Sequence, residues 1–427
     1  MFSKLYTENF RNLSNEEISF RTRRGSLKQA AFFFGDNGVG KTSIIYALGF
    51  LKCTTDAFLY NFRIHQSNST VQPFNLRQHA QQHTRLGAKG ALKIHYELII
   101  DKELYIYTLE FTPEGTLEKE VLFRKVRGNF HVLFSYTGHA LYLCDQEFSK
   151  SMEPWLRRQF NEHIQNYTFL SLIYYGYRED IIHPKNHLCE FLKRLGRYHL
   201  QHESFNHQDH FNIVENQSVY ATHGISPSEF ELFQNAGGVL VTQVAKVLYP
   251  NIDHVRYKYE KQKDGKLAYQ LMTYIKVGDQ VQLAQNHQLP KSYFSFLEFC
   301  FALLDLLVGN AVVYDDMDAL FSSETLKYFI KNITQKTSAQ VMMTFNTPEL
   351  LNYIDPIFAY IFIENNGLVS IRCIDDIEII RDSHNILKRY ESGQYNHYVP
   401  INESGRSYKL LMWFDQYVTS FKKKIGQ

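Results

Sequence analysis

The sequence Gly35-Asp36-Asn37-Gly38-Val39-Gly40-Lys41-Thr42 matches the phosphate-loop pattern, in which a glycine and four further residues precede glycine, lysine and serine or threonine. An apolar run, 31–34, comes directly before it, and apolar residues at helical spacing follow over 44–51. This context makes the match specific, because a phosphate loop joins a core strand to a helix. We therefore predict a strand, a phosphate-binding loop and a helix in that order.

Each part of the loop has a chemical role toward a bound nucleotide. Its glycines let backbone amides wrap the phosphates at a helix N-terminus, and Lys41 would reach the β- and γ-phosphates. The Thr42 hydroxyl would hold Mg²⁺. The predicted nucleotide-binding residues of this segment are Gly35, Asp36, Asn37, Gly38, Val39, Gly40, Lys41, Thr42 and Ser43.

A phosphate loop needs a carboxylate from the end of a second core strand, and residues 311–316 supply one. The apolar strand Ala311-Val312-Val313-Tyr314 leads directly into Asp315 and Asp316. We predict that Asp315 binds Mg²⁺ and that Asp316 orients or deprotonates the attacking water. An aspartate is one methylene shorter than a glutamate, so a site built for glutamate would hold this base about an ångström too far away. The alternative is an acidic loop without a catalytic role.

The next apolar strand, 340–345, ends at Asn346, from which a side chain could sense the γ-phosphate. The alternative is that Asn346 caps the helix expected to begin near Pro348. The two roles are compatible.

The rest of the chain divides by hydrophobic period. Residues 52–90 are polar and predict irregular structure or weak helix, whereas alternation over 92–136 predicts an antiparallel sheet with one solvated face. Helical spacing follows over about 152–200, and strands alternate with helices after 311, which predicts a parallel sheet. No sustained heptads occur, so a long coiled-coil arm is not expected.

Composition excludes several classes of protein. The chain has 427 residues, of which 44% are hydrophobic and 21% charged, so it should form a globule with a sizeable core. A formal net charge of +2 excludes a polycation but permits a local basic patch. Because no apolar run of roughly 18 residues occurs, we expect a soluble, cytoplasmic protein with no membrane partner.

Several stretches together resemble the ABC-type ATPases of the SMC, RecF and OLD-nuclease group. More narrowly, they resemble the short, arm-less ATPases of bacterial anti-phage and abortive-infection systems, including the PARIS type. The stretches are 5–12, 35–43, 315–321 and 339–351, with 167–171 and 387–395 fitting the narrower group. The resemblance implies ATP and Mg²⁺ as ligands and a homo-oligomer, a dimer or higher, formed through the ATPase core.

The fold class implied is α/β, with an ABC-type P-loop ATPase core (a mixed sheet with flanking helices), an antiparallel β lobe and an inserted helical lobe. We expect the core in two halves with the lobes between them. The expected units are 1–51 and 289–375 for the core, 52–150 for the β-rich lobe, 151–250 for the helical insertion, 251–288 for a β-hairpin region and 376–427 for a C-terminal tail.

Departures from the family pattern bear on turnover. The group usually carries Asp-Glu where this chain has Asp315-Asp316, and histidine at the positions of Phe321 and Asn346. The segment that contacts ATP across a dimer retains Ser292 as a phosphate contact, but no glycine accompanies it to let the backbone approach closely. These differences predict intact nucleotide binding and slow hydrolysis.

Three functions compete. The resemblance favours an ATP-dependent sensor and scaffold of an anti-phage system that controls a separately encoded toxic effector, expected to be a nuclease of the Toprim type, with DNA or a phage protein as a possible trigger. The alternative is a RecF-like repair ATPase whose ATP-bound dimer clamps DNA. A stand-alone NTPase acting on a small molecule is the third.

Two polar groups of residues stay ambiguous. The bunch Gln78, His79, Gln81, Gln82 and His83 predicts a solvated polar loop, although one of its glutamines could couple Mg²⁺ to the inserted lobe. The stripe Arg256, Lys258, Lys261, Lys263 and Lys266, interleaved with Tyr257 and Tyr259, and the tail 422–424 are modest nucleic-acid footprints. A solvated strand face is the plainer interpretation of the stripe.

Overall fold

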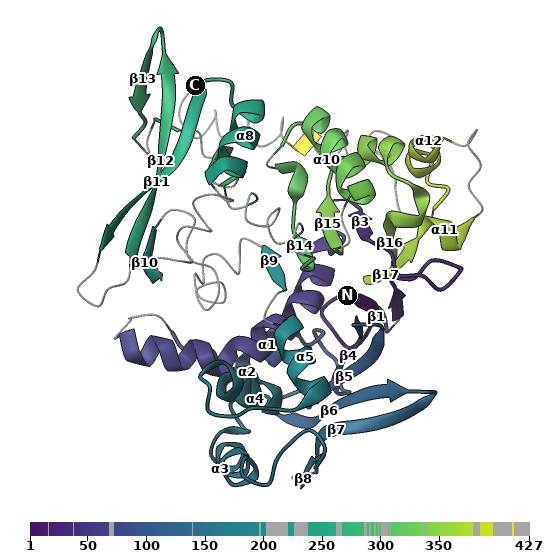
Figure 1. The fold of residues 1–427 in the computed structure, drawn as a ribbon. Coiled ribbons are helices and arrows are strands. Elements are labelled where there is room, and N and C mark those ends of the chain that lie inside the picture. The colour runs from purple at the N-terminus through teal and green to yellow at the C-terminus, as the bar shows by residue number, and fades with distance from the viewer. Residues whose placement is uncertain are drawn as a thin grey trace, which may run out of the picture.

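In the computed structural model the described strands form three sheets, and one long helix packs between two of them (Figure 1). The residues it describes are 1–15, 17–36, 38–67, 72–138, 140–195, 198–201, 221–225, 238–261, 267–285, 288–289, 292–293, 296–297, 299, 306, 309–319, 321–336, 339–378, 385–395 and 412–413.

The six-stranded sheet carries the phosphate loop. Its order is β17-β16-β3-β15-β14-β9, and all neighbours are parallel except the antiparallel edge strand β17. Parallel strands point their carboxyl ends to one edge, so the loop after β3 and the polar residues after β14 and β15 meet there. The strands are β3 (Ala30–Phe34), β9 (His199–Gln201), β14 (Val312–Tyr314), β15 (Val341–Phe345), β16 (Ala359–Asn365) and β17 (Leu368–Cys373).

Strand β3 is buried on both faces, which explains its unbroken apolar sequence. Ala31 and Phe33 face one core, shared with α1 and the second sheet. Ala30, Phe32 and Phe34 face the other, shared with the C-terminal helices. The predicted strand and the predicted parallel sheet are confirmed.

Helix α1 (Lys41–Ser67) begins at the phosphate loop and runs between the six-stranded and seven-stranded sheets (Figure 1). Of the two options predicted from residue 52, irregular structure or weak helix, the structure shows helix over 52–67, as the continuation of α1. The cause is tertiary packing, because polar residues of this stretch are buried together with partners. Lys52 and Asp56, for example, form a buried ion pair 3.0 Å long.

Helix α2 (Leu76–His83) replaces the polar loop predicted around His79. The side chain of Asn75 caps it by accepting from the amide of Gln78. His83 is buried, and its ring stacks on Phe10 with centroids 5.4 Å apart. The histidine rings therefore pack against the core beside α1. Counting histidine as a polar residue does not predict this burial.

The seven-stranded sheet is wholly antiparallel, with the order β2-β1-β4-β5-β6-β7-β8. Buried and partly exposed residues alternate along β4, as the two-residue period predicted. The predicted antiparallel sheet is confirmed. Its strands are β1 (Phe2–Glu8), β2 (Glu17–Ser19), β4 (Leu92–Ile100), β5 (Glu103–Phe111), β6 (Leu117–Val126), β7 (Asn129–Thr137) and β8 (Ala140–Leu143).

Three helices, α3 (Glu153–His163), α4 (Phe169–Arg178) and α5 (Asn186–Leu195), confirm the predicted helical region. A buried carboxylate anchors α4, because Glu120 of β6 accepts hydrogen bonds from the amides of Phe169 and Leu170 at 2.6 and 2.8 Å. Burial raises the pKa of Glu120 to about 7. No long coiled coil occurs in the part of the chain that the structure describes.

The third sheet projects beside helix α8 (Val239–Leu248) (Figure 1). Its strands β11 (Ile252–Lys261) and β12 (Leu267–Val277) confirm the two predicted there, and β10 (Ala221–Ile225) and β13 (Gln280–Leu283) flank β12.

The C-terminal half of the core continues with short helices between strands. The helix predicted from Pro348 is a 3-10 helix, η4 (Pro348–Tyr353). The others are η3 (Met317–Ala319), α10 (Ser323–Lys336), η5 (Pro356–Phe358), α11 (Ile374–Ile377) and α12 (Ile386–Glu391). The predicted α/β class with an antiparallel lobe is confirmed. No helix among the described ranges is long and apolar enough to cross a membrane.

Some predicted features lie outside the described residues. They are Asn37 of the phosphate loop, Lys263 and Lys266 of the basic stripe, and the tail 422–424.

Candidate functional site

The phosphate loop joins β3 to α1 as predicted. Gly38 and Gly40 adopt φ values of +85° and +102°, a region that favours glycine. Lys41 is buried, and its ammonium donates to the carbonyl oxygens of Gly35 and Asp36 at 2.6 and 3.0 Å. Burial lowers the pKa of Lys41, opposed by the nearby aspartates, chiefly Asp316. The lysine thus folds back over its own loop.

Asn12 supports the loop from the segment after β1. The Ser43 hydroxyl donates to Asn12 Oδ1 at 2.7 Å, and Asn12 Nδ2 donates to the carbonyl of Val39 at 3.2 Å. A Cβ at Gly40 would lie 2.3 Å from Asn12 Nδ2, so only glycine fits there. Sequence reasoning missed this contact, which spans 31 positions of chain.

The predicted Mg²⁺ residues are in contact. The Thr42 hydroxyl donates to Asp315 Oδ2 at 3.1 Å, and the Thr344 hydroxyl donates to Asp315 Oδ1 at 2.5 Å. A hydroxyl and a carboxylate oxygen side by side are donors that suit Mg²⁺. Thr344, which sequence reasoning missed, orients the carboxylate from the neighbouring strand.

Asp316 follows on a strained backbone, with φ of +48°. Its amide donates to the Thr344 hydroxyl at 2.8 Å, and its Oδ1 accepts from Asn346 Nδ2 at 3.1 Å. Burial and then the adjacent Asp315 raise the pKa of Asp316, although the hydrogen bond from Asn346 opposes them. A raised pKa is the expected property of a carboxylate that accepts a proton.

Asn346 is held by Asp318, another residue that the sequence did not single out. Asp318 Oδ2 accepts from the amides of Asn346 and Thr347, each at 2.6 Å. Thr347 is the N-cap of η4. The alternative that Asn346 caps this helix is therefore wrong, because its side chain is directed to Asp316.

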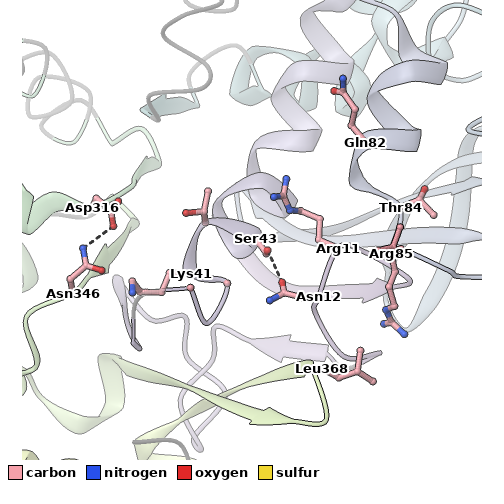
Figure 2. A pocket seen from close by; sticks show the side chains of 15 residues that line it. Arg11, Asn12, Lys41, Ser43, Gln82, Thr84, Arg85, Asp316, Asn346 and Leu368 are labelled. Atoms are coloured by element: carbon pink, nitrogen blue, oxygen red, sulfur yellow. Dashed lines mark hydrogen bonds between the residues drawn. The ribbon is translucent and has the colours of Figure 1, made fainter. Parts of the chain in front are cut away.

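A cavity of about 710 Å³ extends from Asp316 and Asn346 along the phosphate loop (Figure 2). Seven predicted residues line it: Gly38, Gly40, Lys41, Thr42, Ser43, Asp316 and Asn346. The lining residues that sequence reasoning missed are Arg11, Asn12, Gln82, Thr84, Arg85, Leu86, Gly367 and Leu368. Among them, Gln82 was one of the glutamines considered for coupling, and Arg11 and Asn12 belong to the stretch 5–12 that carries the family resemblance.

Ser292 is placed apart from this cavity. It is partly buried, and its hydroxyl lies 3.2 Å from the Tyr249 hydroxyl, which donates to it. Within one chain the structure does not bring Ser292 to the phosphate loop. Its predicted role across a dimer stays a prediction.

The basic stripe does not form one aromatic and cationic face. Tyr257 is buried, whereas Arg256 and Lys258 are exposed on the opposite side of β11. Lys258 also lies 3.8 Å from the carboxylate of Glu260. The described part of the stripe therefore matches the solvated strand face. Within the described ranges, no group of three or more metal-ligating side chains occurs.

No protein-family model matches the sequence, and no curated protein does. Solved structures of SMC heads are similar at 12% identity. An Smc head bound to the C-terminal winged-helix domain of ScpA has a TM-score of 0.49, covering 87% of this chain and 96% of that one. A Pyrococcus furiosus Smc head with an extended coiled coil, bound to the C-terminal domain of ScpA, gives 0.45 with 88% and 97% covered. The SMC head domain from Thermotoga maritima gives 0.39 with 87% and 98%. These values describe a distant similarity.

Proposed function

We propose that this chain is an ABC-type ATPase that binds MgATP and hydrolyses it slowly. The observation that carries the proposal is the meeting of Lys41, Thr42 and Asp315 at one sheet edge, with Thr42 and Asp315 hydrogen-bonded to each other. A glycine-rich turn that binds no nucleotide would have no need of a carboxylate from a second strand beside its threonine.

The side chains have separable roles toward ATP. Loop amides and Lys41 bind the phosphates, and releasing the lysine from the carbonyls of Gly35 and Asp36 frees its donors for them. Thr42 and Asp315 would hold Mg²⁺, which neutralises phosphate charge when bound. Asp316 would orient the attacking water and accept its proton.

Slow turnover has a physical reason at Asp316. Its carboxylate is short, and one oxygen already accepts a hydrogen bond from Asn346. An aspartate base held back by this contact lies far from an in-line water, and a displacement of about an ångström slows a reaction roughly a hundredfold.

The biological role we propose is that of a cytoplasmic sensor and scaffold in a bacterial anti-phage system. ATP binding would assemble the core into a homo-oligomer, with Ser292 contacting the phosphates of a neighbouring copy, and assembly would hold or release a separate effector nuclease. Support comes from the motif set that resembles the arm-less defence ATPases.

Nucleotide binding and assembly are tested together on the purified full chain. Calorimetry with MgATP and mass measurement with and without ATP should show binding and a larger species, and Lys41→Ala should abolish both. If ATP binds but the mass does not change, ATP-dependent assembly is refuted. If the unaltered chain does not bind ATP, the proposed nucleotide binding is refuted as well.

The defence role needs a cellular measurement. Bacteria that express the chain with its neighbouring genes should resist phage plating, and Lys41→Ala should remove the resistance. If ATP instead strengthens binding to duplex DNA, with affinity that falls steeply as salt rises, the RecF-like clamp is the better description.

A further inference from the structure

The cavity is longer than the phosphate site. Asp316 and Asn346 lie at one end, Lys41 follows, and Arg11, Thr84 and Gln82 lie toward the other (Figure 2). Because the loop fixes the phosphates near Lys41, the sugar and base of a nucleotide extend toward the end away from Asp316. That end is built by residues that the phosphate-loop motif does not contain.

The chain after α2 is fastened to the turn after β1. The Arg11 amide donates to the carbonyl of His83 at 2.8 Å, and the Arg85 amide donates to the carbonyl of Asn9 at 2.7 Å. These backbone bonds set residues 84–86 along the cavity wall.

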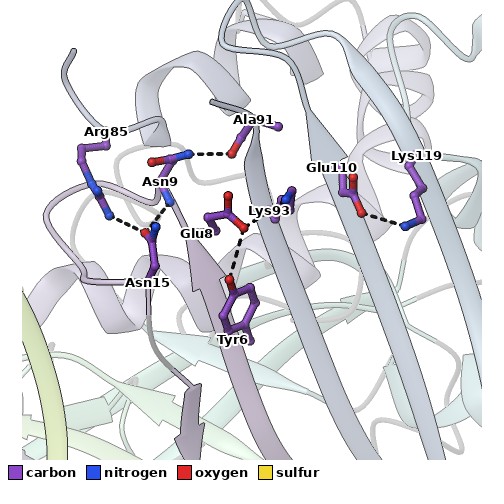
Figure 3. Close-up of polar contacts among 9 residues, drawn as sticks. All are labelled: Tyr6, Glu8, Asn9, Asn15, Arg85, Ala91, Lys93, Glu110 and Lys119. Carbon is purple, nitrogen blue, oxygen red and sulfur yellow. Dashed lines mark hydrogen bonds and ion pairs between the residues drawn. The ribbon is translucent and has the colours of Figure 1, made fainter. Parts of the chain in front are cut away.

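Side chains complete the fastening. Arg85 donates to Asn15 Oδ1 at 2.7 Å, and Asn9 Nδ2 donates to the carbonyl of Ala91 at 2.9 Å (Figure 3). The Arg85 guanidinium also donates to the carbonyl of Leu13 at 2.7 Å. Arg85 is therefore a positioning residue for this wall, since its Nη2 donates both of these hydrogen bonds to the turn.

Arg11 presents a flat cation at the same end. Its guanidinium carbon lies 4.3 Å from the centroid of the Tyr46 ring, and one of its nitrogens lies 3.5 Å from His83 Nδ1. Burial, with smaller contributions from His79 and Arg11, lowers the pKa of His83 to about 2, so its ring is neutral. A planar guanidinium held over an aromatic ring is a suitable stacking surface for a nucleobase.

Gln82 is the polar side chain of α2 that lines this end. Gln81, its neighbour, donates instead to the carbonyl of Glu114 at 2.7 Å, and Gln78 is exposed one turn earlier and does not line the cavity. An amide offers a donor and an acceptor together, which matches the polar edge of a purine. Leu86, fully exposed at the rim, adds apolar surface.

We propose that α2 and residues 84–86 form the nucleobase end of the cavity, with Arg11 as the stacking surface and Gln82 as the residue that hydrogen-bonds the edge of the base. The inference rests on the proposed nucleotide binding and adds the residues that bind the base. Base recognition is thereby assigned to the segment between α1 and β4 together with Arg11 of the turn after β1.

The test compares ATP with magnesium tripolyphosphate, which has the phosphates but no base, by calorimetry on the full chain. Gln82→Ala should weaken ATP binding about fivefold to tenfold, the effect of one hydrogen bond, and leave tripolyphosphate binding unchanged. Arg11→Lys, which keeps the charge but loses the plane, should act in the same direction. Gln78→Ala, one turn away on the same helix, is the matched control and should change neither affinity.

The outcomes distinguish failure of the base-end assignment from failure of nucleotide binding itself. Equal weakening of both ligands by Gln82→Ala, or no effect on either, overturns the base-end assignment while nucleotide binding stands. If the unaltered chain binds neither ligand, nucleotide binding fails and the base-end assignment fails with it.

Discussion

The Thr42 hydroxyl donates a hydrogen bond to Asp315 across 3.1 Å, although 273 positions of chain separate the two residues. The pairing of β15 with both β3 and β14 produces this contact, because it brings the ends of all three strands to one edge. Thr344, at that edge, donates to the same carboxylate. The relationship suggests which substitutions separate nucleotide binding from hydrolysis.

Thr344→Val should lower the ATPase rate by about tenfold or more while leaving ATP affinity within about twofold. The change removes the donor to Asp315 and the acceptor for the Asp316 amide, so both carboxylates lose their orientation. Steady-state phosphate release and ATP calorimetry measure the two effects. Thr344→Ser keeps the hydroxyl and is the control; equal loss in both variants would refute the orienting role.

Asp316→Asn should nearly abolish hydrolysis without weakening ATP binding, because an amide cannot accept the proton. In the unaltered chain the active form is the deprotonated carboxylate, and its pKa lies above the ordinary aspartate value. The rate should therefore fall, as pH is lowered, at a higher pH than an ordinary aspartate would give. A pH profile of the ATPase rate that is flat through this range contradicts the assignment.

Gly40→Ala and Gly38→Ala should differ in their effects. Both glycines have positive φ, which costs an alanine about 1 to 3 kcal/mol, but only a Cβ at Gly40 collides with Asn12. We expect Gly38→Ala to lower thermal stability modestly and Gly40→Ala to lower it further and abolish ATP binding. Thermal unfolding and calorimetry provide the comparison, and identical behaviour of the two variants would argue against the Asn12 contact.

Glu120→Gln should flatten the pH dependence of stability. The pKa of Glu120 is raised to about 7 in the folded chain, above its unfolded value, because of burial. The protonated carboxyl of Glu120 therefore contributes to the free energy of unfolding. This contribution is complete below about pH 4.5 and is lost as the pH rises through about 7. Urea unfolding across this range checks the slope, with exposed Glu118 of the same strand changed to Gln as control. A slope that persists in Glu120→Gln would show that another group causes it.

The sequence alone predicted the parts of the protein that depend on local pattern. The phosphate loop, the strands around it and the antiparallel lobe follow from residue spacing and apolar period, which neighbouring residues set. Asp315 and Asp316 could be assigned because they directly follow an apolar strand, and strand ends are where such sites lie.

Other features depended on contacts between distant segments. The extension of α1 to Ser67, the burial of His83, the clash that excludes a side chain at Gly40 and the anchoring of Asn346 by Asp318 have no local signature, because each involves a partner far away in the chain. A polar side chain is expected at the surface from its chemistry alone, but it can be buried in the core when it has a hydrogen-bonding partner or an aromatic neighbour there. The sequence therefore predicted the phosphate loop, and the tertiary structure decided which residues enclose the rest of the cavity.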